Sequence, residues 1–119
     1  MTSNLTVHVR AGTAGAVIEI AGELDHRTVH EIRAALLRVD LEPGQQLVLD
    51  LEQLTFCDSS GITVLIAARN HALAAGATIV LAAVPHRVSR VFRIVGLDQV
   101  FPTQPTARAA EAAWRPTLS

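Results

Sequence analysis

Hydrophobic and polar residues alternate near the start of the chain. Leu5, Val7 and Val9 are separated by polar residues, which is the period of a half-buried strand. A glycine-containing segment at 12–15 and a second apolar run at 16–21 follow. Two strands joined by a short loop that contains glycine predict an antiparallel hairpin.

The next apolar pattern has helical spacing. One helix face is predicted to consist of Val29, Ile32, Leu36 and Val39. Thr28 is followed three residues later by Glu31, which fits a capping box at the start of a helix. Asp25 is a rival N-cap, so the pattern leaves the first residue of this helix open between the two.

Two later segments predict buried strands, with a helix between them. The apolar runs at 46–51 and 78–84 show almost no alternation, as expected of strands that are covered on both faces. A helical pattern at 60–75 ends at Gly76, a suitable C-terminal cap. We expect the inner side of this helix to carry Ile62, Leu65, Ile66, Arg69 and Leu73.

The last third of the chain predicts two further helices. Pro85 opens the first of them and Gly96 closes it. Its apolar stripe is predicted to consist of Val88, Val91, Phe92 and Val95. A short strand is predicted at 99–101 and an alanine-rich helix at 105–114.

Together these segments predict an α/β fold. Strand–helix–strand crossovers place the later strands in parallel, and the opening hairpin adds an antiparallel edge. We therefore expect a mixed sheet of four to five strands with about four helices packed on it.

Length and composition narrow the class of protein. A chain of 119 residues predicts a single domain over 1–119. Hydrophobic residues make up 50% of the chain but aromatic residues only 3%, which predicts an aliphatic core. The net charge of −1 gives no basic excess for binding nucleic acid or an anionic membrane. No signal-peptide pattern or membrane-spanning run is seen, so a cytoplasmic protein is expected.

The cysteine and the histidines show neither the spacing of a metal site nor the surroundings of a reactive thiol. Cys57 is the single cysteine, and its apolar surroundings predict a buried small hydrophobe and not a reactive thiol. His26, His30, His71 and His86 lack the spacing of metal ligands, and solvent exposure is expected for each. We predict no metal, no cofactor and no catalytic residue.

The strongest candidate site follows the central strand. Asp58, Ser59, Ser60 and Gly61 lie where a helix is predicted to begin, and a serine is a favoured N-cap. Of the two serines, Ser60 is predicted to be the cap. Ser59 is then expected at the rim of the sheet, beside a helix N-terminus that favours negative charge. The hypothesis that follows is reversible phosphorylation of Ser59.

Three segments in this order resemble the STAS domain family, named for sulfate transporters and anti-sigma factor antagonists. They are Gly22-Glu23-Leu24-Asp25-His26, Leu49-Asp50-Leu51 with Asp58-Ser59-Ser60-Gly61, and Pro85, Val88, Arg90-Val91-Phe92 and Gly96-Leu97. Within this family the chain is similar to stand-alone bacterial anti-sigma factor antagonists. The resemblance covers nearly the whole chain and implies the STAS fold.

The resemblance implies a partner-switching cycle without catalysis by the chain itself. The unmodified, monomeric antagonist binds an anti-sigma factor that is also a serine kinase, which releases a sigma factor for transcription. The kinase then phosphorylates the first serine of the Asp-Ser-Ser-Gly motif, here Ser59, and the complex dissociates. A serine phosphatase of the metal-dependent class restores the active form.

Several residues around Ser59 are expected to contact the partner. They are Asp25, His26, Asp58, Ser60, Gly61 and Thr63. Four of them have structural alternatives: Asp25 as an N-cap, Asp58 in an Asx-turn, Ser60 as the cap of the helix that follows and Gly61 in tight packing inside the fold. Thr63 stands where many relatives have a small residue, so it is expected to influence the choice of kinase.

Two other functions compete with this one. A STAS subunit docked to a membrane transport ATPase is the first, but a docking surface has no evident need for a modifiable serine. An enzyme with Ser59 as nucleophile is the second, and it requires a general base and an oxyanion site. The sequence has no Gly-x-Ser-x-Gly elbow and no histidine assignable as the base, so no enzymatic activity is expected.

Overall fold

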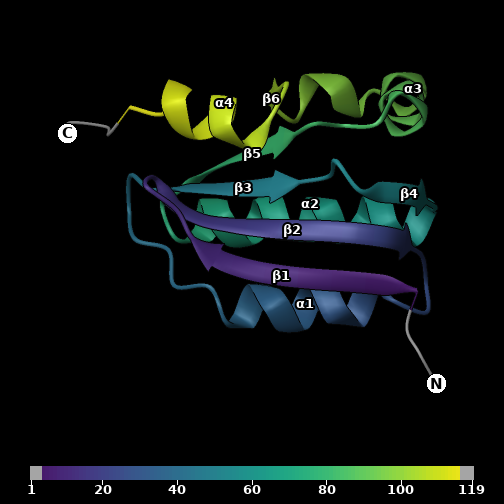
Figure 1. Ribbon diagram of the computed structural model, residues 1–119, viewed down its shortest axis with the longest axis horizontal. Coiled ribbons are helices and arrows are strands. Elements are labelled where there is room, and N and C mark those ends of the chain that lie inside the picture. The colour runs from purple at the N-terminus through teal and green to yellow at the C-terminus, as the bar shows by residue number, and fades with distance from the viewer. Residues whose placement is uncertain (1–3, 116–119) are drawn as a thin grey trace.

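A computed structural model describes residues 4–115, which form a mixed sheet with helices on both faces (Figure 1). The strands are β1 (Leu5–Ala11), β2 (Gly15–Leu24), β3 (Gln46–Asp50), β4 (Leu54–Cys57), β5 (Thr78–Ala82) and β6 (Thr103–Gln104). The helices are α1 (Val29–Leu37), α2 (Ser59–Ala74), α3 (His86–Val95), the 3-10 helix η1 (Leu97–Gln99) and α4 (Ala107–Ala113).

The strand order is β1-β2-β3-β5-β6, and β4 pairs with β2. Strands β1 and β2 are antiparallel, whereas the other four pairings are parallel. The predicted α/β fold with an N-terminal antiparallel hairpin is therefore confirmed.

The core is aliphatic, as the composition predicts. Its main part includes alternate residues of the central strands, such as Ile18 and Leu49, together with Ile32 of α1 and Leu65 of α2. A smaller cluster on the other face joins residues of β2, β3 and β5 to the alanines of α4. All of the largest fully buried side chains are isoleucine, leucine or valine.

Strand β4 was not predicted, and it decides where the candidate site lies. The chain turns sharply after β3, where the Leu54 amide donates to the Leu51 carbonyl at 3.0 Å. A register shift in β2 between Gly22 and Glu23 then interrupts the alternation of β4, so Thr55 and Phe56 are both exposed. Because two neighbouring positions of this four-residue strand are exposed, apolar and polar residues do not alternate along it, and the sequence pattern cannot reveal it.

Helix α2 begins one residue before its predicted start, and its predicted inner side is only partly right. The buried residues are Gly61, Val64, Leu65, Ala68 and Ala72. Leu73 is 47% exposed, and Arg69 is not among the buried residues. The small side chains lie on the buried side because they let the helix backbone approach the sheet closely. The prediction used large apolar residues to identify the inner side, so it did not include these small ones.

The last third of the chain also departs from the predicted pattern. Val88 and Phe92 of α3 are buried, but Val91 and Val95 are 37% and 55% exposed. The strand predicted at 99–101 is wrong: η1 occupies 97–99, and β6 follows at Thr103–Gln104. Phe101 packs on Phe92, with ring centroids 6.1 Å apart. This contact explains the apolar residue at 101, which the sequence pattern had assigned to a strand.

Helix α4 starts later than predicted and is tied to the N-terminal hairpin. Its first residue is Ala107, not Pro105; Thr106 is the N-cap, and the Thr106 hydroxyl accepts a bond of 2.9 Å from the amide of Ala109. The Glu111 carboxylate accepts bonds of 3.1 Å from the Arg10 guanidinium and from the Thr13 amide. These contacts hold α4 across the sheet, far from the ends of β2 and β4 (Figure 1).

Candidate functional site

The ends of β2 and β4 meet at one edge of the sheet. Leu24 and Cys57 are register partners in the parallel pair, and the Asp58 amide donates a bond of 3.2 Å to the Leu24 carbonyl. The residues that follow each strand therefore lie next to each other. Asp25 and His26 come after β2, and the first turn of α2 comes after β4, as the predicted site requires.

Asp58 is the N-cap of α2. Its backbone is extended, with φ −94° and ψ −171°, and its carboxylate accepts a bond of 3.0 Å from the amide of Gly61. The prediction that Ser60 is the cap is wrong. Ser60 is already inside the first helical turn, where its backbone is helical, whereas a cap residue lies just before the helix.

Ser59 is the first residue of α2 and is exposed to solvent. Its carbonyl accepts a bond of 3.0 Å from the exposed Thr63 hydroxyl, one turn further along the helix. The Ser59 hydroxyl thus lies at the positive end of the helix dipole, on the outside of the molecule. A kinase could reach this hydroxyl without any unfolding of the chain.

Gly61 fits a position where no side chain has room. A Cβ built there would lie 2.7 Å from the Cys57 sulfur and 2.9 Å from the Leu24 carbonyl oxygen. Gly61 is buried, so the observed role is tight packing of α2 against β2 and β4. Its predicted contact with a partner stays a prediction.

The β2–α1 loop is organised by its own side chains. Asp25 is only 6% exposed. Its carboxylate accepts a hydrogen bond of 2.9 Å from the Arg27 amide and forms an ion pair with the Arg27 guanidinium at 3.1 Å. This hydrogen bond from the guanidinium is the main cause that lowers the pKa of Asp25. The exposed His26 lies between these two residues.

Thr28 is the residue before α1, as predicted, but it does not make the capping-box bond. Its hydroxyl instead donates to the Glu23 carbonyl at 2.9 Å and accepts from the Asp25 amide at 3.0 Å. The side chain therefore joins the end of β2 to the loop. This contact holds Asp25 in place beside the first turn of α2.

Cys57 is half-buried beneath the site. Burial, and to a lesser degree the nearby Asp58, raise the pKa of this thiol to about 11. The thiol is therefore protonated at neutral pH, in agreement with the prediction of an unreactive cysteine. His26, His30 and His86 are exposed and His71 is half-buried, and no group of histidine, cysteine or carboxylate side chains within residues 4–115 could hold a metal.

Sequence reasoning missed one residue of this region. Phe56 is 49% exposed and is the register partner of Glu23, beside the end of β2. The sequence pattern assigned no role to Phe56, and the irregular pairing of β4 places it on the surface. Exposed aromatic residues are enriched at protein interfaces.

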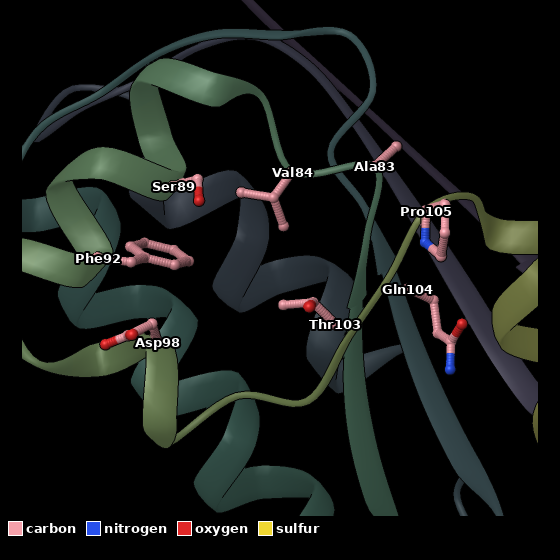
Figure 2. A pocket seen from close by; sticks show the side chains of 8 residues that line it. All are labelled: Ala83, Val84, Ser89, Phe92, Asp98, Thr103, Gln104 and Pro105. Carbon is pink, nitrogen blue, oxygen red and sulfur yellow. The ribbon is translucent and has the colours of Figure 1, made fainter.

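A separate hollow of about 400 Å³ lies between α3, η1 and the ends of β5 and β6 (Figure 2). Ser89, Asp98 and Thr103 contribute polar groups to it. Phe92 also lines it but is only 2% exposed, and Ala83, Val84 and Pro105 supply further apolar lining. None of the residues 57–61 lines this hollow, and it adds nothing to the Ser59 site.

Comparison with known proteins supports the fold and shows the family. The family profile described as "Mlab, STAS domain" matches residues 7–103. The anti-sigma-B factor antagonist of Listeria monocytogenes is 26% identical over 98 residues, which cover 82% of this chain and 86% of the relative.

Two solved structures share the fold over nearly their full length. The anti-sigma factor antagonist of Mycobacterium paratuberculosis has a TM-score of 0.74 at 26% identity, covering 93% of this chain and 94% of the other. The Bacillus cell fate determinant SpoIIAA in its phosphorylated form has a TM-score of 0.69 at 25% identity, covering 92% and 100%.

The chain belongs to the STAS domain family. Its similarity to several anti-sigma factor antagonists agrees with the predicted class, a regulatory binding protein. Among residues 4–115, no helix has the length and apolar character needed to cross a membrane.

Proposed function

We propose that this chain is an anti-sigma factor antagonist whose binding is switched off by phosphorylation of Ser59. In the unmodified form it binds an anti-sigma factor that is also a serine kinase, and a sigma factor is released. A serine phosphatase of the metal-dependent class reverses the modification. The chain acts as a monomer in the cytoplasm, where the sigma factor and ATP are found.

The exposed Ser59 hydroxyl at the first position of α2 is the observation that carries this proposal. It lies at the edge where β2 and β4 end, next to the ordered loop that contains Asp25 and His26. A partner that covers this edge would contact residues from both strand ends together. The structural similarity to SpoIIAA, which was solved in a phosphorylated form, supports a protein whose state is changed by phosphorylation.

The capping bond of Asp58 explains how a phosphate would act here. The Asp58 carboxylate already occupies the Gly61 amide, so a phosphate on Ser59 would place about 1.5 to 2 further negative charges beside it. Like charges brought together at an interface can cost several kcal/mol. Because 1.4 kcal/mol is a tenfold change in affinity, about 3 kcal/mol would weaken a complex about a hundredfold without any refolding.

The direct test is to incubate the purified protein with a lysate of its native cells and Mg-ATP, then to locate phosphate by mass spectrometry. We expect a single phosphate on Ser59. Ser59→Ala should remain unmodified, whereas the matched variant Ser60→Ala should be modified like the wild type. Equal phosphorylation of Ser59→Ala and wild type would exclude this site and the proposed switch.

A further inference from the structure

Exposed side chains continue from the Ser59 site across β4 to α3. Phe56 is 49% exposed on β4. Among the described strands β4 pairs with β2 alone, so its other edge is open. A groove of about 390 Å³ follows this region and is lined by Leu54, Thr55, Pro85, His86, Arg87 and Val88. This groove connects β4 to the first turn of α3, at the same end of the molecule (Figure 1).

The outward side of α3 is basic. Arg87, Arg90 and Arg93 are exposed, and α3 contains no acidic residue. None of these three arginines takes part in an ion pair within residues 4–115. Their charge is therefore available to acidic groups on another molecule.

Apolar residues are exposed among these arginines. Val88 and Phe92 already fill the side of α3 that faces the core, so the opposite side should be polar. Instead, Ile94 is 80% exposed and Val91 is 37% exposed. Apolar side chains surrounded by guanidinium groups are typical of a binding surface, where an apolar centre is bordered by charged residues.

We propose that the protein partner which binds at Ser59 also docks on a second surface, which we call the α3 face. It consists of Thr55, Phe56, His86, Arg87, Arg90 and Ile94. The partner presents acidic groups around an apolar patch to this face. This inference rests on the proposed function, and it adds a recognition surface that phosphorylation of Ser59 does not alter.

The two parts of the interface have opposite charge. At the Ser59 site Asp25 is paired with Arg27, which leaves the Asp58 carboxylate as the acidic group beside the serine, whereas Arg87 and Arg90 lie on the α3 face. A partner must match both parts at once, which determines its orientation and excludes proteins that match only one. The α3 face thus contributes to the choice of kinase, while Ser59 turns binding on and off.

An anionic lipid surface is the other binder that arginines with an exposed isoleucine could suit. Two observations favour a protein. The main apolar stripe of α3, Val88 and Phe92, is buried in the core and cannot enter a bilayer. The carboxylate of Asp58, which forms no ion pair within residues 4–115, lies at the same end of the molecule and would be repelled by anionic headgroups.

The test measures the affinity for the kinase that phosphorylates Ser59, purified from the native cells by its activity on the wild-type protein. The double variant Arg87→Glu/Arg90→Glu is compared with Arg33→Glu/Arg38→Glu, whose exposed arginines lie within α1 and at its C-cap, on another side of the molecule (Figure 1). Circular dichroism confirms that each variant is folded. We expect the α3 variant to bind at least tenfold more weakly and to lose most of the salt dependence of binding, and the α1 variant to match the wild type.

Phe56→Ala provides a second variant that leaves the charge unchanged, and a loss of affinity of tenfold or more is expected. If the wild type is bound and phosphorylated at Ser59 but both α3-face variants bind equally well, the α3 face is excluded and the proposed function stands. If the wild type is neither bound nor phosphorylated, the proposed function fails and the inference fails with it. Binding of the wild type, but not the α3 variant, to phosphatidylglycerol vesicles with no change in kinase affinity would assign the face to lipid and overturn the inference.

Discussion

The Asp58 amide donates a hydrogen bond of 3.2 Å to the carbonyl of Leu24, thirty-four positions earlier in the chain. This bond continues the parallel pairing of β2 and β4 into the loop that precedes α2. It fixes the first turn of α2 against the end of β2, and so places Ser59 beside the loop that contains Asp25. The predictions below test the consequences of that arrangement.

Substitutions at Ser59 should separate the two states of the proposed switch. Ser59→Ala removes the acceptor hydroxyl and should bind the kinase constitutively. Ser59→Asp places a negative charge beside Asp58 and should bind at least tenfold more weakly, because like charges at an interface are unfavourable. Isothermal titration calorimetry measures both affinities, and equal values would remove the electrostatic mechanism.

The capping role of Asp58 predicts a stability difference between two neighbouring positions. Asp58→Ala should lower the free energy of unfolding by about 1 kcal/mol, because the Gly61 amide loses its acceptor. Ser60→Ala should change it by less than about 0.5 kcal/mol, because Ser60 lies inside the helix and makes no cap. Urea denaturation distinguishes the two positions, and a larger loss for Ser60→Ala would contradict the assignment of the cap.

Gly61→Ala should destabilise the fold by about 1–3 kcal/mol, as expected of overpacking in a tight contact. The added methyl would meet the Cys57 sulfur at 2.7 Å and the Leu24 carbonyl at 2.9 Å. Urea denaturation of this variant and of Cys57→Ala/Gly61→Ala measures the effect. The double variant removes the nearest atom, so it should recover part of the stability that Gly61→Ala alone loses; no loss for Gly61→Ala would show that the contact relaxes freely.

The ion pair of Asp25 with Arg27 predicts a dependence on acidic pH. The pKa of Asp25 is held below its usual value of 3.8 in the folded protein, mainly by the hydrogen bond from Arg27. The stabilising contribution is therefore complete above that usual value and is lost as the pH falls through the lowered folded pKa. In Arg27→Ala the pKa of Asp25, followed by NMR titration, should rise toward its usual value, whereas Arg33→Ala should leave it unchanged.

The thiol of Cys57 should react slowly while the protein is folded. Burial raises its pKa to about 11, so almost no thiolate is present at neutral pH. We expect a disulfide reagent such as Ellman's reagent to label the native protein at pH 7.5 at least tenfold more slowly than the urea-unfolded chain. Equal rates in the two states would show that the thiol is exposed.

Much of the fold could be predicted because its signals are local. The alternation of Leu5, Val7 and Val9 identified β1, and the continuous apolar runs identified β3 and β5 as buried strands. Helix ends were less predictable, since several residues near a helix start can serve as cap. Asp58 and Ser60 are both favoured cap residues, and only the extended backbone of Asp58 decides between them.

The candidate site was predicted in part. The motif indicated Ser59, and the structure places it on the surface, but the importance of Phe56 could not be recognised. An isolated phenylalanine carries no sequence signal of an exposed position, because most large apolar side chains are buried. Its exposure follows from the register shift of β2 opposite β4, a feature that no local pattern encodes.

By itself the sequence determined the four main helices, the strands β1, β2, β3 and β5, the parallel direction of the later strands and the motif that contains Ser59. These follow from hydrophobic periodicity and from turn and capping preferences, which act between residues a few positions apart. Only the tertiary structure decided that β4 pairs with β2, that Asp25 lies beside the first turn of α2, and that Thr55 of β4 and Arg87 of α3 line the same groove. Strand pairing and helix packing join residues that are distant in the chain, so the energies that select them depend on the whole fold and not on any local segment.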